Sequence, residues 1–240
     1  MLQKVTKMPP FGMYFDFNLL LWIAPALILA FIAQAMVQSA YAHARQVPAR
    51  YSGAAAARKI LDAAGLQDVA IEQIPGTLSD HYDPQHKVLR LSQDIYHGRS
   101  LAAVGIAAHE AGHALQDATR YPLMVVRSMA VPMASFGSSI GGILLMAGLF
   151  IGLQTLAIVG LVLFAGTAVF QLVNLPVEFN ASSRAKTLLV EQGIIDVSEL
   201  PEVKRVLNAA ALTYVAATLQ SVLSLLYYAS LVLGGNRRHE

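Results

Sequence analysis

The segment His109-Glu110-Ala111-Gly112-His113 combines the residue types and the spacing of a hydrolytic metal site. In an α-helix, residues i and i+4 lie one above the other on the same face, so the two imidazole rings can hold one metal ion between them. The glutamate that follows the first histidine can then reach a water molecule on that ion and act as a general base. Zinc lowers the pKa of such a water toward 7. We therefore predict a zinc-dependent hydrolase with Glu110 as its catalytic base.

A catalytic zinc site needs a third protein ligand and leaves its fourth position to water. The chain has no cysteine, which excludes a thiolate ligand as well as any disulfide framework. The acidic candidate is Glu178, which ends a stretch of fifty residues without Asp, Glu, Lys or Arg. We favour Glu178 because polar residues follow it one helical turn away and could support a ligand. The remaining histidines are the alternatives: His43, His81, His86, His97 and His239.

The composition indicates that these residues belong to an integral membrane protein. Charged residues make up only 13% of the 240 residues, and residues of the AVILMFWYC set make up 55%. An average soluble domain is about 25% charged, so this chain has too little charge to cover a water-exposed surface. Intrinsic disorder is excluded because it requires low hydrophobicity and high charge. The net charge of +2, without a basic run, does not indicate nucleic acid as a partner.

Gaps between charged residues predict four transmembrane helices. Residues 17–44, 128–177 and 206–236 contain no Asp, Glu, Lys or Arg. A helical span needs about 20 apolar residues, so the first and third gaps each hold one span, and the second holds two with a turn at 152–154. The first run is too long for the apolar region of a cleaved signal peptide and is expected to remain as a span. We expect the spans near 17–39, 132–151, 155–176 and 206–233.

The spans divide the chain into five parts. These are an N-terminal tail with the first span (1–40), a water-facing catalytic segment (41–127), the second and third spans (128–176), a helix with the third zinc ligand (177–205), and the fourth span with the C-terminal tail (206–240). Four spans place both water-facing parts on one side of the membrane, so His109 and Glu178 can meet there. In the catalytic segment we expect helices at 53–64 and 100–118, strands at 68–74 and 88–91, and a polar, turn-rich stretch between the strands.

Weaker candidates lie around the motif. Tyr214 or Arg184 could stabilise the oxyanion of a tetrahedral intermediate, although each also suits an ordinary role at a membrane surface. Asp117, four residues after His113, could hold the ring of that histidine. The second expected strand could pair with an extended substrate, or it could be an inner strand of a small sheet. Its residues are Val88, Leu89, Arg90 and Leu91.

The chain resembles the gluzincin metallopeptidases, in which a glutamate on a later helix completes the zinc site. It is most similar to the YugP-type membrane zinc metallopeptidases, distant relatives of the HtpX and CAAX-prenyl proteases. The resemblance rests on residues 109–116 and on Leu175-Pro176-Val177-Glu178-Phe179, followed by Ala181-Ser182 and Arg184-Ala185. Residues 210–216 resemble the last span of that family, so the similarity covers nearly the whole chain.

This resemblance implies a mainly α membrane protein with four transmembrane helices and a small α+β, minigluzincin-like portion on one side. It also implies one Zn²⁺ per chain, with His109, His113 and Glu178 as ligands and Glu110 as the base. Asn180 stands where the family commonly has an aspartate, and Ser182 stands where many related gluzincins have one. An amide or a hydroxyl can still hydrogen-bond a ligand histidine, so both remain candidates for that role.

The predicted function is that of a membrane-embedded zinc endopeptidase that hydrolyses peptide bonds near the membrane surface. Its substrates would be peptides or membrane proteins, and the resemblance implies a role in membrane-protein quality control. The lipid bilayer is a partner, and an accessory membrane protein is a further candidate. Eight Lys and Arg residues on the loop side, against four on the terminal side, predict a catalytic segment in the cytoplasm. With the resemblance, the expected membrane is a bacterial inner (plasma) membrane.

Two alternatives to a peptidase remain. The first is a catalytically inactive, zinc-binding membrane scaffold or adaptor, against which the intact Glu110 argues. The second is a transporter or channel, which ranks last because no predicted span carries a charge in mid-membrane.

Overall fold

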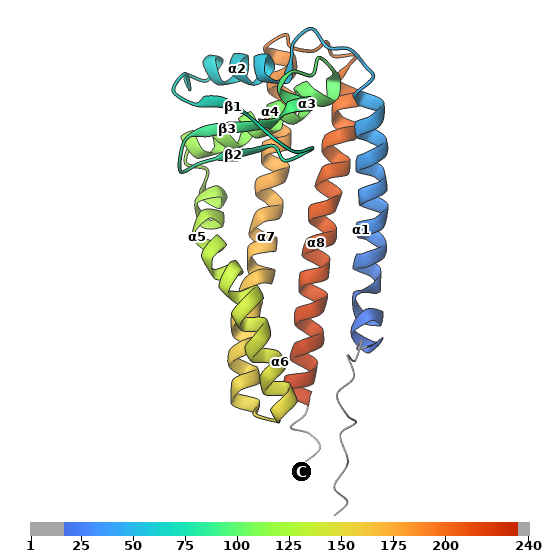
Figure 1. Ribbon diagram of the computed structural model, residues 1–240, viewed down its shortest axis with the longest axis vertical. Helices are drawn as coiled ribbons and strands as arrows, with labels where there is room; N and C mark the ends of the chain where they lie inside the picture. The colour runs from blue at the N-terminus through green and yellow to red at the C-terminus, as the bar shows by residue number, and fades with distance from the viewer. Residues whose placement is uncertain (1–16, 235–240) are drawn as a thin grey trace, which may run out of the picture.

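The computed structural model describes residues 17–234, and four long helices dominate it. They run side by side along the long axis of the molecule, with the small sheet at one end (Figure 1). The first is α1 (Phe17–Ala44). The second consists of α5 (Pro122–Phe136), the π-helical segment η1 (Gly137–Gly141) and α6 (Gly142–Ile151). The third and fourth are α7 (Gln154–Glu191) and α8 (Leu200–Gly234).

All four helices are long and apolar enough to cross a membrane, in agreement with the four predicted spans. The second begins at Pro122, ten residues before the expected position 132. Proline is favoured at the first position of a helix, where its missing N–H costs no hydrogen bond. The four terminal cations used to predict the orientation, and one candidate ligand, lie outside the described residues: Lys4, Lys7, Arg237, Arg238 and His239.

The second and third long helices form a tight antiparallel hairpin at the expected turn. Gly152, with a φ of +73°, adopts the left-handed conformation that glycine tolerates, and it separates α6 from α7. Beside this turn the two helices touch closely, since a Cβ atom on Gly160 would lie 2.1 Å from the backbone nitrogen of Leu145. Such a contact admits only glycine. The hairpin therefore holds its two helices in a defined register.

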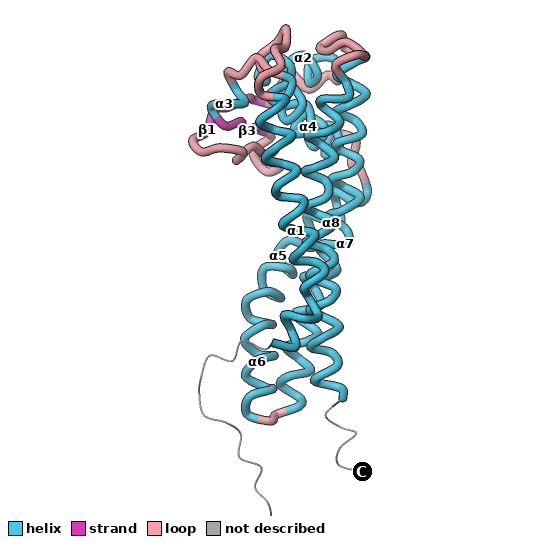
Figure 2. Tube along the Cα trace, turned by 90° about the vertical axis from the view of Figure 1, so that its right-hand side faces the viewer, coloured by secondary structure: helices cyan, strands magenta, loops and turns pink. Residues whose placement is uncertain are grey.

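The remaining elements form the small α+β part that the sequence predicts. Figure 2 shows these elements gathered at one end of an elongated molecule. The sheet has the strand order β1-β3-β2, with β1 parallel and β2 antiparallel to β3. In chain order the elements are α2 (Gly53–Ala63), β1 (Ala70–Ile74), β2 (His81–Asp83), β3 (Val88–Ser92), α3 (Gln93–Tyr96) and α4 (Leu101–Ala118).

β3 is the central strand, so of the two alternatives for Val88, Leu89, Arg90 and Leu91 the inner strand is confirmed, and a free edge for a substrate is ruled out. Its backbone pairs with β1 on one side and with β2 on the other. Three of its four predicted side chains are buried, as suits an inner strand. The sequence does not predict β2, because that strand has only three residues and buries only Tyr82.

α4 carries the His-Glu-X-X-His segment and lies between the sheet and the upper parts of α7 and α8 (Figure 1). Ser100 caps this helix, since its hydroxyl accepts a hydrogen bond from the N–H of Ala103 at 3.2 Å. Leu101 and Val104 of α4 are fully buried in a core that also contains Leu89 of β3 and Leu189 of α7. Burial of one such leucine stabilises the fold by about 1.5–3 kcal/mol relative to its exposure. This core fixes α4 between the sheet and the helical bundle.

Candidate metal centre

The candidate site forms where α4 contacts α7. His109 and His113 lie on one face of α4, and Glu178 lies on α7. Gly112 permits the close approach of the two helices, since a Cβ atom at that position would lie 2.8 Å from the carbonyl oxygen of Ala181. A glycine between the two histidines is therefore part of what brings them to Glu178.

Three donor atoms converge at this contact. Nε2 of His109 lies 3.2 Å from Oε2 of Glu178, and Nε2 of His113 lies 3.4 Å from the same oxygen. In a tetrahedral zinc site with bonds of about 2.0–2.1 Å, neighbouring donors are about 3.3 Å apart. The two observed distances match this spacing. Within residues 17–234, these three side chains are the one group of His and acidic residues with metal-binding geometry.

Each histidine ring is oriented by a contact to its other nitrogen. Oγ of Ser182 lies 3.1 Å from Nδ1 of His109, and Oε1 of Gln116 lies 2.9 Å from Nδ1 of His113. With Nδ1 engaged in this way, Nε2 is left to bind a metal ion. The donors and their supports therefore fit zinc.

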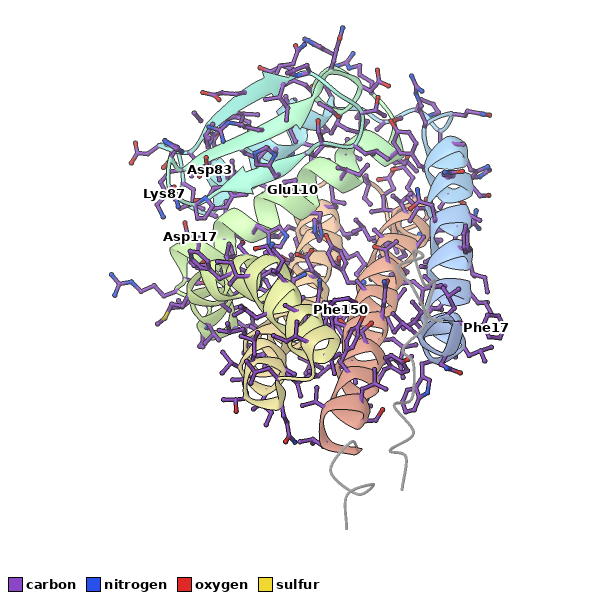
Figure 3. All side chains as sticks on the ribbon, turned by 60° about the horizontal axis from the view of Figure 1, so that its bottom comes forward. Phe17, Asp83, Lys87, Glu110, Asp117 and Phe150 are labelled. Carbon is purple, nitrogen blue, oxygen red and sulfur yellow. The ribbon has the colours of Figure 1, made fainter. Side chains whose placement is uncertain are left out.

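Gln116 is the residue that meets the ring of His113, and the prediction that Asp117 does so is wrong. The Asp117 carboxylate accepts a hydrogen bond from the Tyr82 hydroxyl at 2.7 Å and pairs with Lys87. Figure 3 shows Asp117 and Lys87 toward one edge of the molecule, with Glu110 further inside. Residue 116 faces α7 and residue 117 faces β2, so the choice between them depends on how α4 sits between those elements.

Asn180 and Arg184 lie behind the donor atoms. Oδ1 of Asn180 accepts hydrogen bonds from Nε2 of Gln116 at 3.0 Å and from Nε of Arg184 at 2.9 Å. Asn180 thus contacts the side chain that orients His113, and Arg184 is directed toward Asn180. Asn180 and Ser182 are the two candidates to hydrogen-bond a ligand histidine, and Ser182 is the one that contacts a ligand ring directly.

The histidines considered as alternative third ligands lie elsewhere in the described chain. Their contacts are His43 with Glu202, His81 with the carbonyl oxygen of Ser79, His86 with Asp83, and His97 with Gln73. None of these four belongs to the group formed by His109, His113 and Glu178.

Glu110 lies beside the donor atoms, and burial raises the pKa of its carboxyl to about 7. His109 lowers this pKa, whereas the neighbouring Glu178 and Asp80 raise it, and a hydrogen bond from the Tyr82 backbone lowers it again. A carboxyl whose pKa lies near neutrality can both take up and release a proton. These are the properties of a general acid-base group.

Two cavities meet at Glu110. One, of about 360 Å³, is lined by α1, α4 and α8, and the other, of about 260 Å³, is lined by α4, α5 and the β2 region. Asp80, Glu110 and Tyr214 line both. Tyr214 of α8 also shares the lining of the smaller cavity with Glu178. The two cavities together offer space for a chain that passes across the candidate site.

Arg127 of α5 is a further part of the site that the sequence motifs do not reveal. Its Nη1 lies 3.4 Å from Oε1 of Glu178, and its side chain lines the smaller cavity. One signal for it exists in the sequence: Arg127 is the last charged residue before the fifty-residue uncharged stretch, and Glu178 is the first after it.

Comparisons with known proteins identify a zinc metallopeptidase family and a membrane protease as matches to this chain. The family model described as "Putative neutral zinc metallopeptidase" matches residues 19–233, a range that includes every residue of the candidate centre. A relative from Bacillus subtilis (strain 168), "Putative membrane protease YugP", is 46% identical over 212 residues, which cover 88% of this chain and 94% of the relative. No solved structure gives a significant match. The match to a zinc peptidase family supports zinc as the cofactor, in line with the donor set.

Proposed function

This chain belongs to the neutral zinc metallopeptidase family, and from that premise we propose that it is a membrane-embedded endopeptidase that hydrolyses peptide bonds near the membrane surface. The observation that carries the proposal is the convergence of Nε2 of His109, Nε2 of His113 and Oε2 of Glu178 beside the carboxyl of Glu110. This arrangement contains both a metal-binding donor set and a group that can move a proton.

In this proposal His109, His113 and Glu178 are the zinc ligands. A zinc ion bound by them supplies Lewis acidity and lowers the pKa of a water at the open position. Ser182 and Gln116 keep the two rings turned so that Nε2 faces Glu178. These supports are fixed before any substrate arrives, which limits the reorganisation needed during the reaction.

Glu110 is the general base and then the general acid. Its carboxylate takes a proton from the water whose oxygen attacks the carbonyl carbon of the substrate. It then gives that proton to the departing amide nitrogen as the C–N bond breaks. A pKa of about 7 suits both steps at neutral pH. Tyr214, which lines both cavities beside Glu110, is our candidate donor to the oxyanion. Arg184 is not, because it is engaged with Asn180.

The substrate is proposed to lie along β2, because β3 has neighbours on both sides and offers no free edge. β2 is an edge strand, and its Tyr82 lines the smaller cavity together with Glu110, so this strand lies beside the catalytic carboxyl. The larger cavity is lined in part by apolar side chains of α1 and α8, two helices long enough to cross a membrane. This supports membrane proteins, or segments of them at the membrane surface, as substrates.

The cellular setting follows as part of the same proposal. We place the catalytic part at the cytoplasmic face of the membrane, on the distribution of Lys and Arg among the loops. The relative from Bacillus subtilis supports a bacterial plasma membrane as that membrane. A protease with this access fits membrane-protein quality control, and an accessory membrane protein could control entry to the cavities. An inactive zinc-binding scaffold would use the same three ligands, but it would not require a carboxyl with a raised pKa, such as that of Glu110, beside them.

The test compares three forms of the full-length protein, purified in detergent: wild type, Glu178→Ala and Glu110→Gln. We expect about one zinc per chain in the wild type, loss of most zinc in Glu178→Ala, and full zinc content without cleavage of a protein substrate in Glu110→Gln. Wild type that holds no zinc after supplementation would overturn the proposal. A Glu110→Gln variant with unchanged activity in vivo would favour the scaffold.

A further inference from the structure

We propose that Arg127 is a positioning residue of the metal centre. It holds Oε1 of Glu178 and thereby keeps Oε2 turned toward the two histidines. This inference rests on the proposed function, since it concerns the same zinc ligands, and it gives a role to a side chain that no motif identifies.

The two oxygens of the Glu178 carboxylate have different surroundings. Oε2 lies 3.2 Å from Nε2 of His109 and 3.4 Å from Nε2 of His113, whereas Oε1 lies 3.4 Å from Nη1 of Arg127. The side chain of Glu178 is only 3% exposed, so water can do little to stabilise its charge. A cation on Oε1 stabilises that charge and also opposes rotation of the carboxylate, which would move Oε2 away from the histidines.

The other neighbours of Glu178 cannot take over this task. A histidine that binds a metal ion through Nε2 is neutral, so His109 and His113 provide no positive charge of their own in the loaded site. Tyr214, which shares the smaller cavity with Glu178, carries no charge at neutral pH. Arg184, six residues further along α7, donates to Asn180. Among the described residues, Arg127 is the one Lys or Arg that forms an ion pair with Glu178.

The hairpin explains why Arg127 and Glu178 meet. Arg127 lies 25 residues before Gly152, and Glu178 lies 25 residues after Leu153, so they stand at equal distances from the turn between α6 and α7. At about 1.5 Å per residue, each arm measures roughly 37 Å, a little more than the hydrocarbon thickness of a bilayer. The close contact of Gly160 with Leu145 keeps the arms in register. The hairpin therefore brings the two charges that bracket its apolar stretch together at the same membrane surface.

The start of α5 is tied to the same centre by a second route. The N–H of Tyr121 donates to the carbonyl oxygen of Gln116 at 2.8 Å, and the N–H of Met124 donates to the carbonyl oxygen of Tyr121 at 2.9 Å. Gln116 is also the residue whose side chain meets His113. The turn that leads into α5 thus begins at Gln116, which also orients His113. Arg127 lies one helical turn beyond Met124, so this turn helps to fix its position relative to the metal centre.

Two other roles for Arg127 make different predictions. As an anchor in the lipid headgroups it would be exposed, but its side chain is only 27% exposed and its guanidinium faces a buried carboxylate. As a binder of a substrate carboxylate it would leave zinc binding unaffected. A positioning role instead predicts that zinc binding itself depends on Arg127.

The experiment measures zinc affinity of the full-length protein in detergent by competition with a chelator, for wild type, Arg127→Gln, Arg127→Lys and the control Arg120→Gln. Arg120 is exposed and lies in the turn between α4 and α5. The substitution Arg120→Gln therefore removes one positive charge, as Arg127→Gln does, but at a position away from the metal centre. Loss of a partner that orients a metal ligand weakens metal binding by about 10- to 100-fold. We expect a loss of this size in Arg127→Gln, a smaller one in Arg127→Lys because lysine ends in a point charge, and none in Arg120→Gln.

A second readout reports on the ligand geometry directly. With Co²⁺ in place of zinc, the visible absorption bands of Arg127→Gln should differ from those of wild type, and those of Arg120→Gln should not. If Arg127→Gln binds zinc as tightly as wild type and gives the same Co²⁺ spectra, the inference is wrong. It is also wrong if Arg127→Gln raises the KM but leaves zinc affinity unchanged, because Arg127 would then bind substrate. If Arg127→Gln does not fold, Arg127→Met, which keeps a long side chain without its charge, takes its place, and wild-type affinity and spectra in that variant overturn the inference equally. Wild type without zinc would instead refute the proposed function together with this inference.

Discussion

Gln116 connects His113 of α4 to the backbone of α7 immediately before Glu178. Its Oε1 accepts from Nδ1 of His113 at 2.9 Å, and its Nε2 donates to the carbonyl oxygen of Val177 at 2.8 Å. Gln116 is fully buried, so both contacts are made away from solvent. One side chain thus relates a proposed ligand on one helix to the segment that carries the third ligand on another.

Gln116→Leu should weaken zinc binding by about 10- to 100-fold, because the ring of His113 loses the partner that orients it. It should also lower the free energy of unfolding by about 1–3 kcal/mol, because the Val177 carbonyl is left buried with one partner fewer. Zinc competition and chemical unfolding in detergent measure the two effects. Gln116→Glu is the matched control, since it keeps an acceptor for His113 and removes the donor to Val177. Equal zinc affinity in Gln116→Leu and wild type would show that this contact is dispensable.

Gly112→Ala should damage the metal centre without touching a ligand. The added methyl group would lie 2.8 Å from the carbonyl oxygen of Ala181, so α4 must move away from α7. Overpacking of this kind costs about 1–3 kcal/mol, and the movement separates both histidines from Glu178. Zinc content and thermal unfolding test this expectation. Gly142→Ala serves as the control because nothing lies within 4 Å of its added methyl group. A Gly112→Ala protein with wild-type zinc content would contradict the proposed need for close helix contact.

Ala210→Phe should change which peptide bonds are cleaved. Ala210 of α8 lines the larger cavity, so a phenylalanine there fills space that a substrate side chain would occupy. We expect cleavage next to large apolar residues to fall by about tenfold or more, with cleavage next to glycine or alanine retained. Sequencing of products from a peptide mixture, together with zinc content, provides the measurement. An unchanged product pattern would mean that this cavity does not receive the substrate.

Asp83→Asn should remove part of the pH dependence of stability. The Arg90 guanidinium, 2.6 Å away, holds the pKa of Asp83 well below its usual range, and His86 lowers it further. Because the folded pKa lies below the unfolded value of about 3.9, the ionised carboxylate stabilises the fold above that pH. The contribution is lost as the pH falls toward the folded pKa. Unfolding of both proteins at several pH values should show a difference that is largest near pH 7 and shrinks below about pH 4. A difference that does not change with pH would argue against this pair.

Local features of the chain suffice to predict much of the fold. Charge-free stretches locate four long helices, and Gly152 marks the turn between two of them. The cap at Ser100 and the spacing of His109 and His113 place both histidines on one face of a helix that begins at Leu101. These predictions hold because helix geometry, capping and the length of an apolar span depend on residues that are near one another in sequence.

Other features depend on how distant elements pack. β3 is central because β1 and β2 both pair with it, and β2 is too short and too polar to be expected from its own residues. The partner of His113 is Gln116 in place of Asp117 because α4 has α7 on one side and β2 on the other. Arg127 reaches Glu178 only because the helical hairpin folds back on itself. Each of these contacts joins residues whose relative positions are set by the packing of whole helices and strands, which no local pattern encodes.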